Sequence, residues 1–143
     1  MAKNLVFKND NKKNRVEDLG ETLASGTPVV STSGAPAVTV TASADYTVSE
    51  VIPGVGTLSG IPAGGASLVG TEVSLAFDGT WEFPEDDIAG TTAATAEQGD
   101  AIYITALNEL TTTAGSNTPY GVVDFPAEYD KSRGMIPVKI GAR

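Results

Sequence analysis

From Gly20 onward, glycine and proline interrupt this chain so often that helices have little room. The sequence has 16 glycines and 8 prolines in 143 residues. Together with Ser, Thr and Asp, they separate apolar stretches of four to seven residues. Such short apolar stretches between turn residues are typical of β-strands, whereas helices need longer segments with a period of 3.6 residues. The sequence therefore predicts an all-β fold, and its length corresponds to one domain.

Eight strands are expected, and they are too short for anything but a small shared core. A single core with this many strands favours a barrel or a sandwich. Residues 53–70, which are dense in Gly and Pro, are expected to form a loop, and residues 93–98 one helical turn. The expected strands lie at residues 27–31, 37–41, 46–52, 71–77, 80–83, 100–105, 120–125 and 135–140.

Asp78-Gly79 lies between two alternating apolar runs and is a strong signal for a β-hairpin. A two-residue loop would place the large side chains of the two strands on opposite faces. A three-residue loop, from Asp78 to Thr80, would gather them on one face, and we favour it because one face then becomes the core. The predicted core of this hairpin contains Val73, Leu75, Phe77, Trp81 and Phe83.

The last expected strand also alternates, with Ile136, Val138 and Ile140 directed into the core. Pro137 has no N–H to donate. We therefore expect this strand at a sheet edge, or at a place where that hydrogen bond is not needed.

The charge of the chain is divided along the sequence. Residues 1–15 carry five basic side chains and one acidic one, and residues 131–143 carry four basic side chains and no acidic one. Residues 16–130 hold 17 carboxylates and no Lys or Arg, so the net charge is −9. An acidic body repels nucleic acid, whereas the basic ends can bind an acidic protein surface. We expect a protein partner and no nucleic acid.

Several common functions are disfavoured by composition. The chain contains no Cys and no His, which removes thiolate and Ser-His-Asp catalysis and the usual zinc sites. The acidic cluster Glu82, Glu85, Asp86 and Asp87 fits a solvated turn and the first turn of a short helix better than a glycosidase or calcium site. We expect no enzyme, no metal and no cofactor. We also expect no membrane span and no signal peptide, and therefore synthesis in a cytoplasm.

Residues 1–19 contain no Gly or Pro, but their dense charge and four Asn disfavour both a helix and burial in a core. They are expected to form an extended arm in front of a domain at residues 20–143. Leu5-Val6-Phe7 is its one apolar element, a short strand that could pair with the sheet edge of another chain. The alternative is a frayed, solvated terminus.

Several short motifs succeed one another in an order that resembles the head decoration proteins of tailed bacteriophages, also called capsid cement or stabilisation proteins. They cover the start and most of residues 70–143. Residues 31–69 depart from that pattern and are expected to be an insertion, in which residues 37–41 pair with residues 46–52 ahead of the Gly-rich loop. The motifs are residues 1–8, Ser25-Gly-Thr-Pro-Val-Val30, residues 73–84, residues 98–104, Leu110-Thr-Thr-Thr113, Gly121-Val-Val123 and Val138-Lys-Ile-Gly141.

The resemblance implies a small β-barrel or β-tulip body, a homotrimer, and a place on the outer surface of the mature head. The partner would be the major capsid protein, whose lattice the protein would stabilise. The arm would bind it through Leu5, Val6 and Phe7 by strand pairing, and through Lys8, Lys12, Lys13 and Arg15 by charge.

Two other functions stay open at this point. One is a different virion component, such as a tail tube or a head fibre. The other is a carbohydrate- or cell-surface-binding module that stacks a ligand on Trp81, Tyr103 or Tyr120.

Overall fold

The computed structural model describes residues 5–7, 15–41, 47–54, 56–62 and 71–141. These residues form thirteen strands and two single-turn 3₁₀ helices, without an α-helix in the described ranges. The all-β prediction is confirmed. The strands are β1 Leu5–Phe7, β2 Arg15–Asp18, β3 Pro28–Val30, β4 Pro36–Thr39, β5 Thr47–Ile52, β6 Gly56–Pro62, β7 Glu72–Ala76, β8 Thr80–Pro84, β9 Ile88–Ala89, β10 Ala101–Ile104, β11 Leu110–Thr111, β12 Thr118–Val123 and β13 Met135–Ile140; the 3₁₀ helices are η2 Glu85–Asp87 and η3 Lys131–Arg133.

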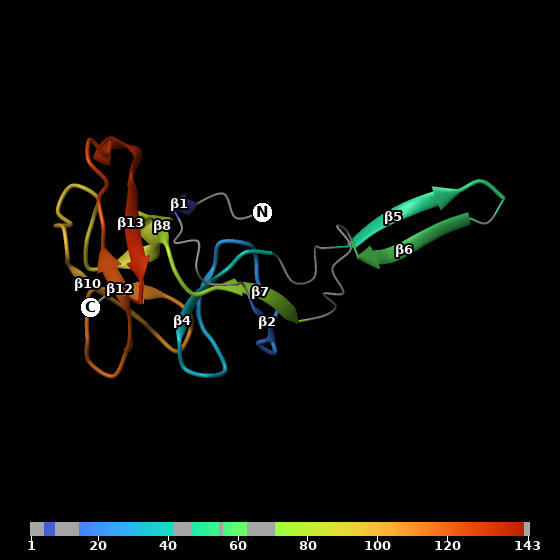
Figure 1. The fold of residues 1–143 in the computed structure, drawn as a ribbon, viewed down its shortest axis with the longest axis horizontal. Coiled ribbons are helices and arrows are strands. Elements are labelled where there is room, and N and C mark those ends of the chain that lie inside the picture. Colours follow the sequence, from blue (N-terminus) through green and yellow to red (C-terminus); the bar gives the residue numbers. More distant parts are fainter. Residues whose placement is uncertain (1–4, 8–14, 42–46, 55, 63–70, 142–143) are drawn as a thin grey trace.

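The strands are arranged in three sheets (Figure 1). A curled seven-stranded sheet has the order β1-β8-β13-β12-β10-β11-β9, and a four-stranded sheet has the order β2-β7-β4-β3. The third sheet contains only β5 and β6. Nearly all strand pairs are antiparallel; β9 and β11 form the parallel pair. The curled large sheet gives the body its barrel-like form.

Two clusters of apolar side chains make up the core. The larger one fills the seven-stranded sheet and includes Trp81, Phe83, Ile136, Val138 and Ile140. The smaller one lies in the four-stranded sheet and includes Val73 and Leu75, with Phe77 half-buried against it. The apolar residues that the sequence assigned to the core therefore lie in two clusters rather than on one face.

Tyr120 joins the two sheets. Its side chain is fully buried on β12, and its hydroxyl donates a hydrogen bond of 2.8 Å to the backbone carbonyl of Ala37 on β4. Its ring also meets the Phe83 ring edge-on, at 6.2 Å between centroids. Burial raises the pKa of the Tyr120 hydroxyl, so it remains a donor at neutral pH.

The predicted hairpin at Asp78-Gly79 is wrong. β7 pairs with β2 and β4, whereas β8 pairs with β1 and β13, so the chain crosses between sheets at this corner. The Trp81 indole N–H donates to the Asp78 carbonyl at 2.8 Å and fixes the corner. Gly79 has a φ of 94° there. Each strand has two neighbours within its own sheet, so both of its edges are paired without a hairpin.

The expected pairing within residues 31–69 is also wrong. β4, which overlaps the expected strand 37–41, pairs with β3 and β7. β5 pairs instead with β6, in a segment that was expected to be a loop. Gly54 and Gly56 adopt positive φ in the connection, which permits the chain to reverse tightly. The glycines that indicated a loop therefore form a turn and part of a strand.

Pro137 lies in an inner strand, because β13 runs between β12 and β8. The edge position predicted for this strand is wrong. The alternative prediction, that the N–H missing from Pro137 is not needed for pairing, applies instead. The Pro137 carbonyl accepts from the Asp124 N–H at 2.9 Å, just beyond the end of β12. The N–H and C=O of one residue in an antiparallel strand point to the same side. The missing donor therefore faces the place where β12 has already ended.

Candidate functional site

The N-terminal strand β1 forms one edge of the seven-stranded sheet. It pairs antiparallel with β8 of the same chain, with Leu5 opposite Trp81 and Phe7 opposite Thr80. Its other side has no neighbour among the described strands. The apolar segment of the predicted arm is thus held on the body by backbone hydrogen bonds, and its outer backbone edge is open.

Arg15, at the start of β2, fixes the far end of the arm. Its guanidinium forms an ion pair with Glu17, lies 4.9 Å from the centroid of the Phe77 ring, and donates to Ser33 Oγ at 3.3 Å. Burial alone would raise the pKa of Glu17, but hydrogen bonds from the Thr32 N–H and from Arg15 outweigh it and lower that pKa. Arg15 therefore has a structural role in addition to any role in docking. Lys8, Lys12 and Lys13, the other predicted cations, lie outside the described residues.

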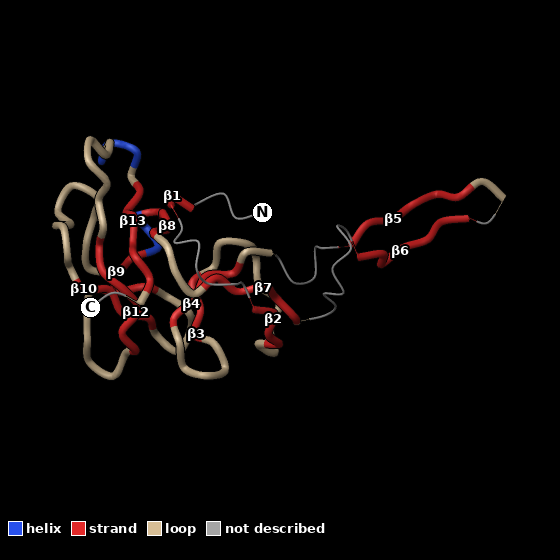
Figure 2. Tube along the Cα trace, in the orientation of Figure 1, coloured by secondary structure: helices blue, strands red, loops and turns tan. Residues whose placement is uncertain are grey.

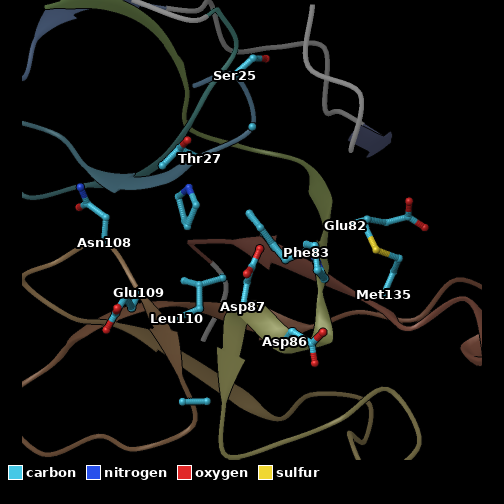
Figure 3. Close-up of a pocket in the computed structure, with 14 residues that line it drawn as sticks. Ser25, Thr27, Glu82, Phe83, Asp86, Asp87, Asn108, Glu109, Leu110 and Met135 are labelled. Atoms are coloured by element: carbon cyan, nitrogen blue, oxygen red, sulfur yellow. The ribbon is translucent and has the colours of Figure 1, made fainter. Parts of the chain in front are cut away.

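A groove of about 880 Å³ opens between the two large sheets (Figure 3). Ser25 and Thr27 line it from the segment before β3, Phe83 from β8, and Leu110 from β11. Its acidic side chains come from three separate places: Glu82 on β8, Asp86 and Asp87 on η2, and Glu109 before β11. The sequence brought only three of these four carboxylates together. Glu109 joins them because it directly precedes β11, which pairs with β9, and β9 directly follows η2.

The carboxylates of this region have structural partners where they are buried. Glu82 accepts two hydrogen bonds from Arg133, at 2.8 and 3.1 Å, and one from the Tyr129 hydroxyl at 2.7 Å. Burial raises the pKa of the Tyr129 hydroxyl, and its hydrogen bond to Glu82 raises it further. Glu85 accepts from the Ala93 N–H at 2.7 Å. In the described part of the chain, no group of three or more acidic side chains is placed to hold a metal ion.

Two of the three aromatic side chains considered for ligand stacking are inside the protein. Trp81 and Tyr120 are each 1% exposed, and both donate hydrogen bonds to backbone carbonyls. Only Tyr103 remains partly accessible, beside a shallow hollow of about 430 Å³ that also includes Asp100 and Thr112. The three rings form no common platform, so the carbohydrate-binding alternative loses its main support.

The β5–β6 hairpin stands away from the body (Figure 2). Its two strands contact each other extensively, and neither packs extensively on another described element. Sequence reasoning missed this element because it assigned β6 to a loop.

A further finding concerns membranes: none of the described segments is a helix long and apolar enough to cross one.

Comparison with known proteins places the chain in a family. The family model for the phage cement protein matches residues 31–140, more than three quarters of the chain and including the β5–β6 hairpin. No curated protein and no solved structure matches it. Cement proteins are structural components of the phage capsid, in agreement with the resemblance seen in the motifs. The chain belongs to the phage cement protein family.

Proposed function

We propose that this cement protein binds the outer surface of the mature phage head and stabilises the lattice of the major capsid protein. The observation that carries the proposal is the combination of an open strand edge and a basic segment at the N-terminus. β1 lies at the edge of the large sheet, and residues 8–15, which follow it, hold four of the nine basic side chains. An extended strand of the capsid protein could add to β1 by backbone hydrogen bonds while these cations contact its acidic groups.

Stabilisation follows from linkage. A protein that binds only the expanded lattice lowers the free energy of that state by its binding free energy. We propose that three copies form a homotrimer, so that after the first arm has bound, the others bind at high effective concentration. Leu5, Val6, Phe7, Lys8, Lys12, Lys13 and Arg15 are the proposed contact residues. The virion is the proposed location, after synthesis in the cytoplasm of the host bacterium.

A pair of variants with equal net charge tests the arm. The first carries Lys8→Gln, Lys12→Gln and Lys13→Gln. The control carries Thr113→Glu, Ala114→Glu and Ser116→Glu, in an exposed loop between β11 and β12. Each variant lowers the net charge by three, so a general repulsion would affect both equally. We expect the first to lose binding to undecorated expanded shells in a co-sedimentation assay and the control to keep it.

Undiminished binding of the Lys→Gln variant would refute charge docking by the arm.

A second measurement tests the location. Electron microscopy of particles carrying labelled protein should show a regular array over the shell. Label confined to the tail or to a single vertex would instead favour a tail or fibre component. Arg15 is left unchanged in both variants because it stabilises the body through Glu17 and Phe77.

A further inference from the structure

The β5–β6 hairpin lacks the support that such a structure needs. Figure 1 shows it projecting from the body, and its strands pair only with each other. A two-stranded hairpin alone in water is marginally stable, and three or more strands are usually required. The hairpin therefore needs a further strand or surface, and nothing in the described part of its own chain supplies one.

The hairpin also has the longest open strand edges of the described structure. β5 and β6 have six and seven residues. The edges of the body are shorter, and all except β1 are protected: three of the four residues of β2 are charged, β3 has three residues and starts with proline, and β9 has two residues. β1, the edge of the proposed capsid contact, has three residues. Short, charged or proline-containing edges discourage pairing with another chain. The β5 edge has no such protection except Glu50, whereas β6 contains Pro62.

Charge favours a second copy of this chain as the partner. The body carries most of its 17 carboxylates outside residues 36–70, where the only charged residues are Asp45 and Glu50. Contact between two acidic bodies would be opposed by charge repulsion, whereas contact between two hairpins, which carry few charges, would meet little repulsion. A second copy also offers an edge of the same length and the same lack of protection. A two-fold contact of this kind uses one surface twice and is the commonest closed arrangement.

We propose that β5 strands of two copies pair antiparallel, so that two hairpins form one continuous four-stranded sheet. β5 is the better edge because β6 contains Gly56, Gly60 and Pro62, which weaken strand pairing. A two-fold antiparallel pair places one residue opposite its own copy, because successive residues of a strand point to opposite faces. With Ser49 at the axis, Val48 lies opposite Glu50 of the second copy, and Thr47 lies opposite its Val51. No like charges oppose each other in this register.

This pairing is independent of capsid binding through the arm. It requires only purified protein in solution. On a shell, it would join neighbouring cement subunits to one another as well as to the lattice.

Cysteine cross-linking tests the register directly, because the natural chain contains no cysteine. Full-length Ser49→Cys is purified and oxidised. Opposed residues of an antiparallel pair lie within disulfide distance. We expect a disulfide-linked dimer, because each Ser49 lies opposite its own copy in the proposed register. Full-length Thr57→Cys is the control and should not form this dimer, because Thr57 lies on β6, one strand further from the proposed contact.

Absence of the dimer in Ser49→Cys would overturn the proposal. So would equal cross-linking of Thr57→Cys, since it would show random collision or another contact.

A charge pair gives a second, non-covalent test of the same contact. In the variant Val48→Glu, the proposed register brings the new carboxylate opposite Glu50 of the second copy. In Val48→Lys, it brings a cation opposite the same Glu50 instead. By analytical ultracentrifugation, we expect concentration-dependent association beyond the proposed trimer to be lost in the first variant and retained in the second. Identical behaviour of the two variants would contradict the register.

Discussion

Replacing Tyr120 with phenylalanine tests whether the two sheets are joined by the hydrogen bond between Tyr120 and Ala37. The hydroxyl is fully buried and donates to the Ala37 carbonyl at 2.8 Å. Phenylalanine keeps the ring and its edge-on contact with Phe83, but removes the only hydrogen bond in the described structure that the hydroxyl makes. The substitution therefore isolates one polar interaction in an otherwise unchanged apolar environment.

The expected cost is that of the hydrogen bond itself. Ala37 lies opposite Val29 in the β3–β4 ladder, between the bonded positions 27/39 and 31/35, so its carbonyl is not left without a donor. A typical hydrogen bond contributes about 0.5 to 1.5 kcal/mol net. We therefore expect Tyr120→Phe to lower the free energy of unfolding by about 1 kcal/mol. In a protein of this size, each kcal/mol corresponds to a decrease in Tm of roughly 2 to 4 °C.

Urea unfolding followed by tryptophan fluorescence measures this change, because Trp81 lies in the same core cluster as Tyr120. Tyr103→Phe is the matched control. Its hydroxyl makes no hydrogen bond within the described ranges and its side chain is only partly buried, so little change is expected. A Tyr120→Phe variant as stable as the parent, or no less stable than the Tyr103→Phe control, would refute the assigned role of the hydroxyl.

Three further predictions rest on single features. Because burial raises the pKa of the Tyr120 hydroxyl, the unfolded chain loses this proton at a lower pH than the folded protein. The contribution of this group to stability is therefore fully present below about pH 10 and is lost above it. In urea titrations at alkaline pH, Tyr120→Phe should reduce the slope of the free energy of unfolding against pH. The pKa of Glu17 is lowered instead, so its contribution is present above its ordinary value of 4.5 and is lost on acidification; Glu17→Gln should flatten the acid limb of the same titration. Gly121→Ala places a Cβ against the Lys139 carbonyl oxygen and should destabilise the fold by about 1 to 3 kcal/mol, measured by calorimetry, whereas Gly99→Ser, in open space, isolates the effect of positive φ alone.

The sequence predicted local structure well wherever one strand could be read alone. The alternation in residues 135–140 indicated both the strand and its buried residues, because period-two patterning requires only that one side face the core. Composition also predicted the all-β class, and the succession of short motifs indicated the cement protein family. Only the structure showed which strands are neighbours.

The Asp78-Gly79 corner illustrates the difference. Locally, the sequence has the turn and the flanking alternation of a hairpin, and either sheet assignment buries Trp81. The outcome depends on distant partners: β13 and β1 pair with β8, while β2 and β4 pair with β7. Those partners are residues far apart in the chain, which the local pattern around Asp78-Gly79 does not specify. The same reasoning explains the groove, where Glu109 meets η2 only because β11 pairs with β9.

By itself, therefore, the sequence predicted the longer strands of the body, most of the apolar residues of the core and the charge division between a basic N-terminus and an acidic body, but not β2, β6, β9 and β11. The tertiary structure decided the distribution of the core over two sheets, the position of β1 on the edge of β8, and the separation of the β5–β6 hairpin from the body. The physical reason is that side-chain patterning is a property of each strand, whereas strand pairing is a competition among all strands for the same backbone hydrogen bonds.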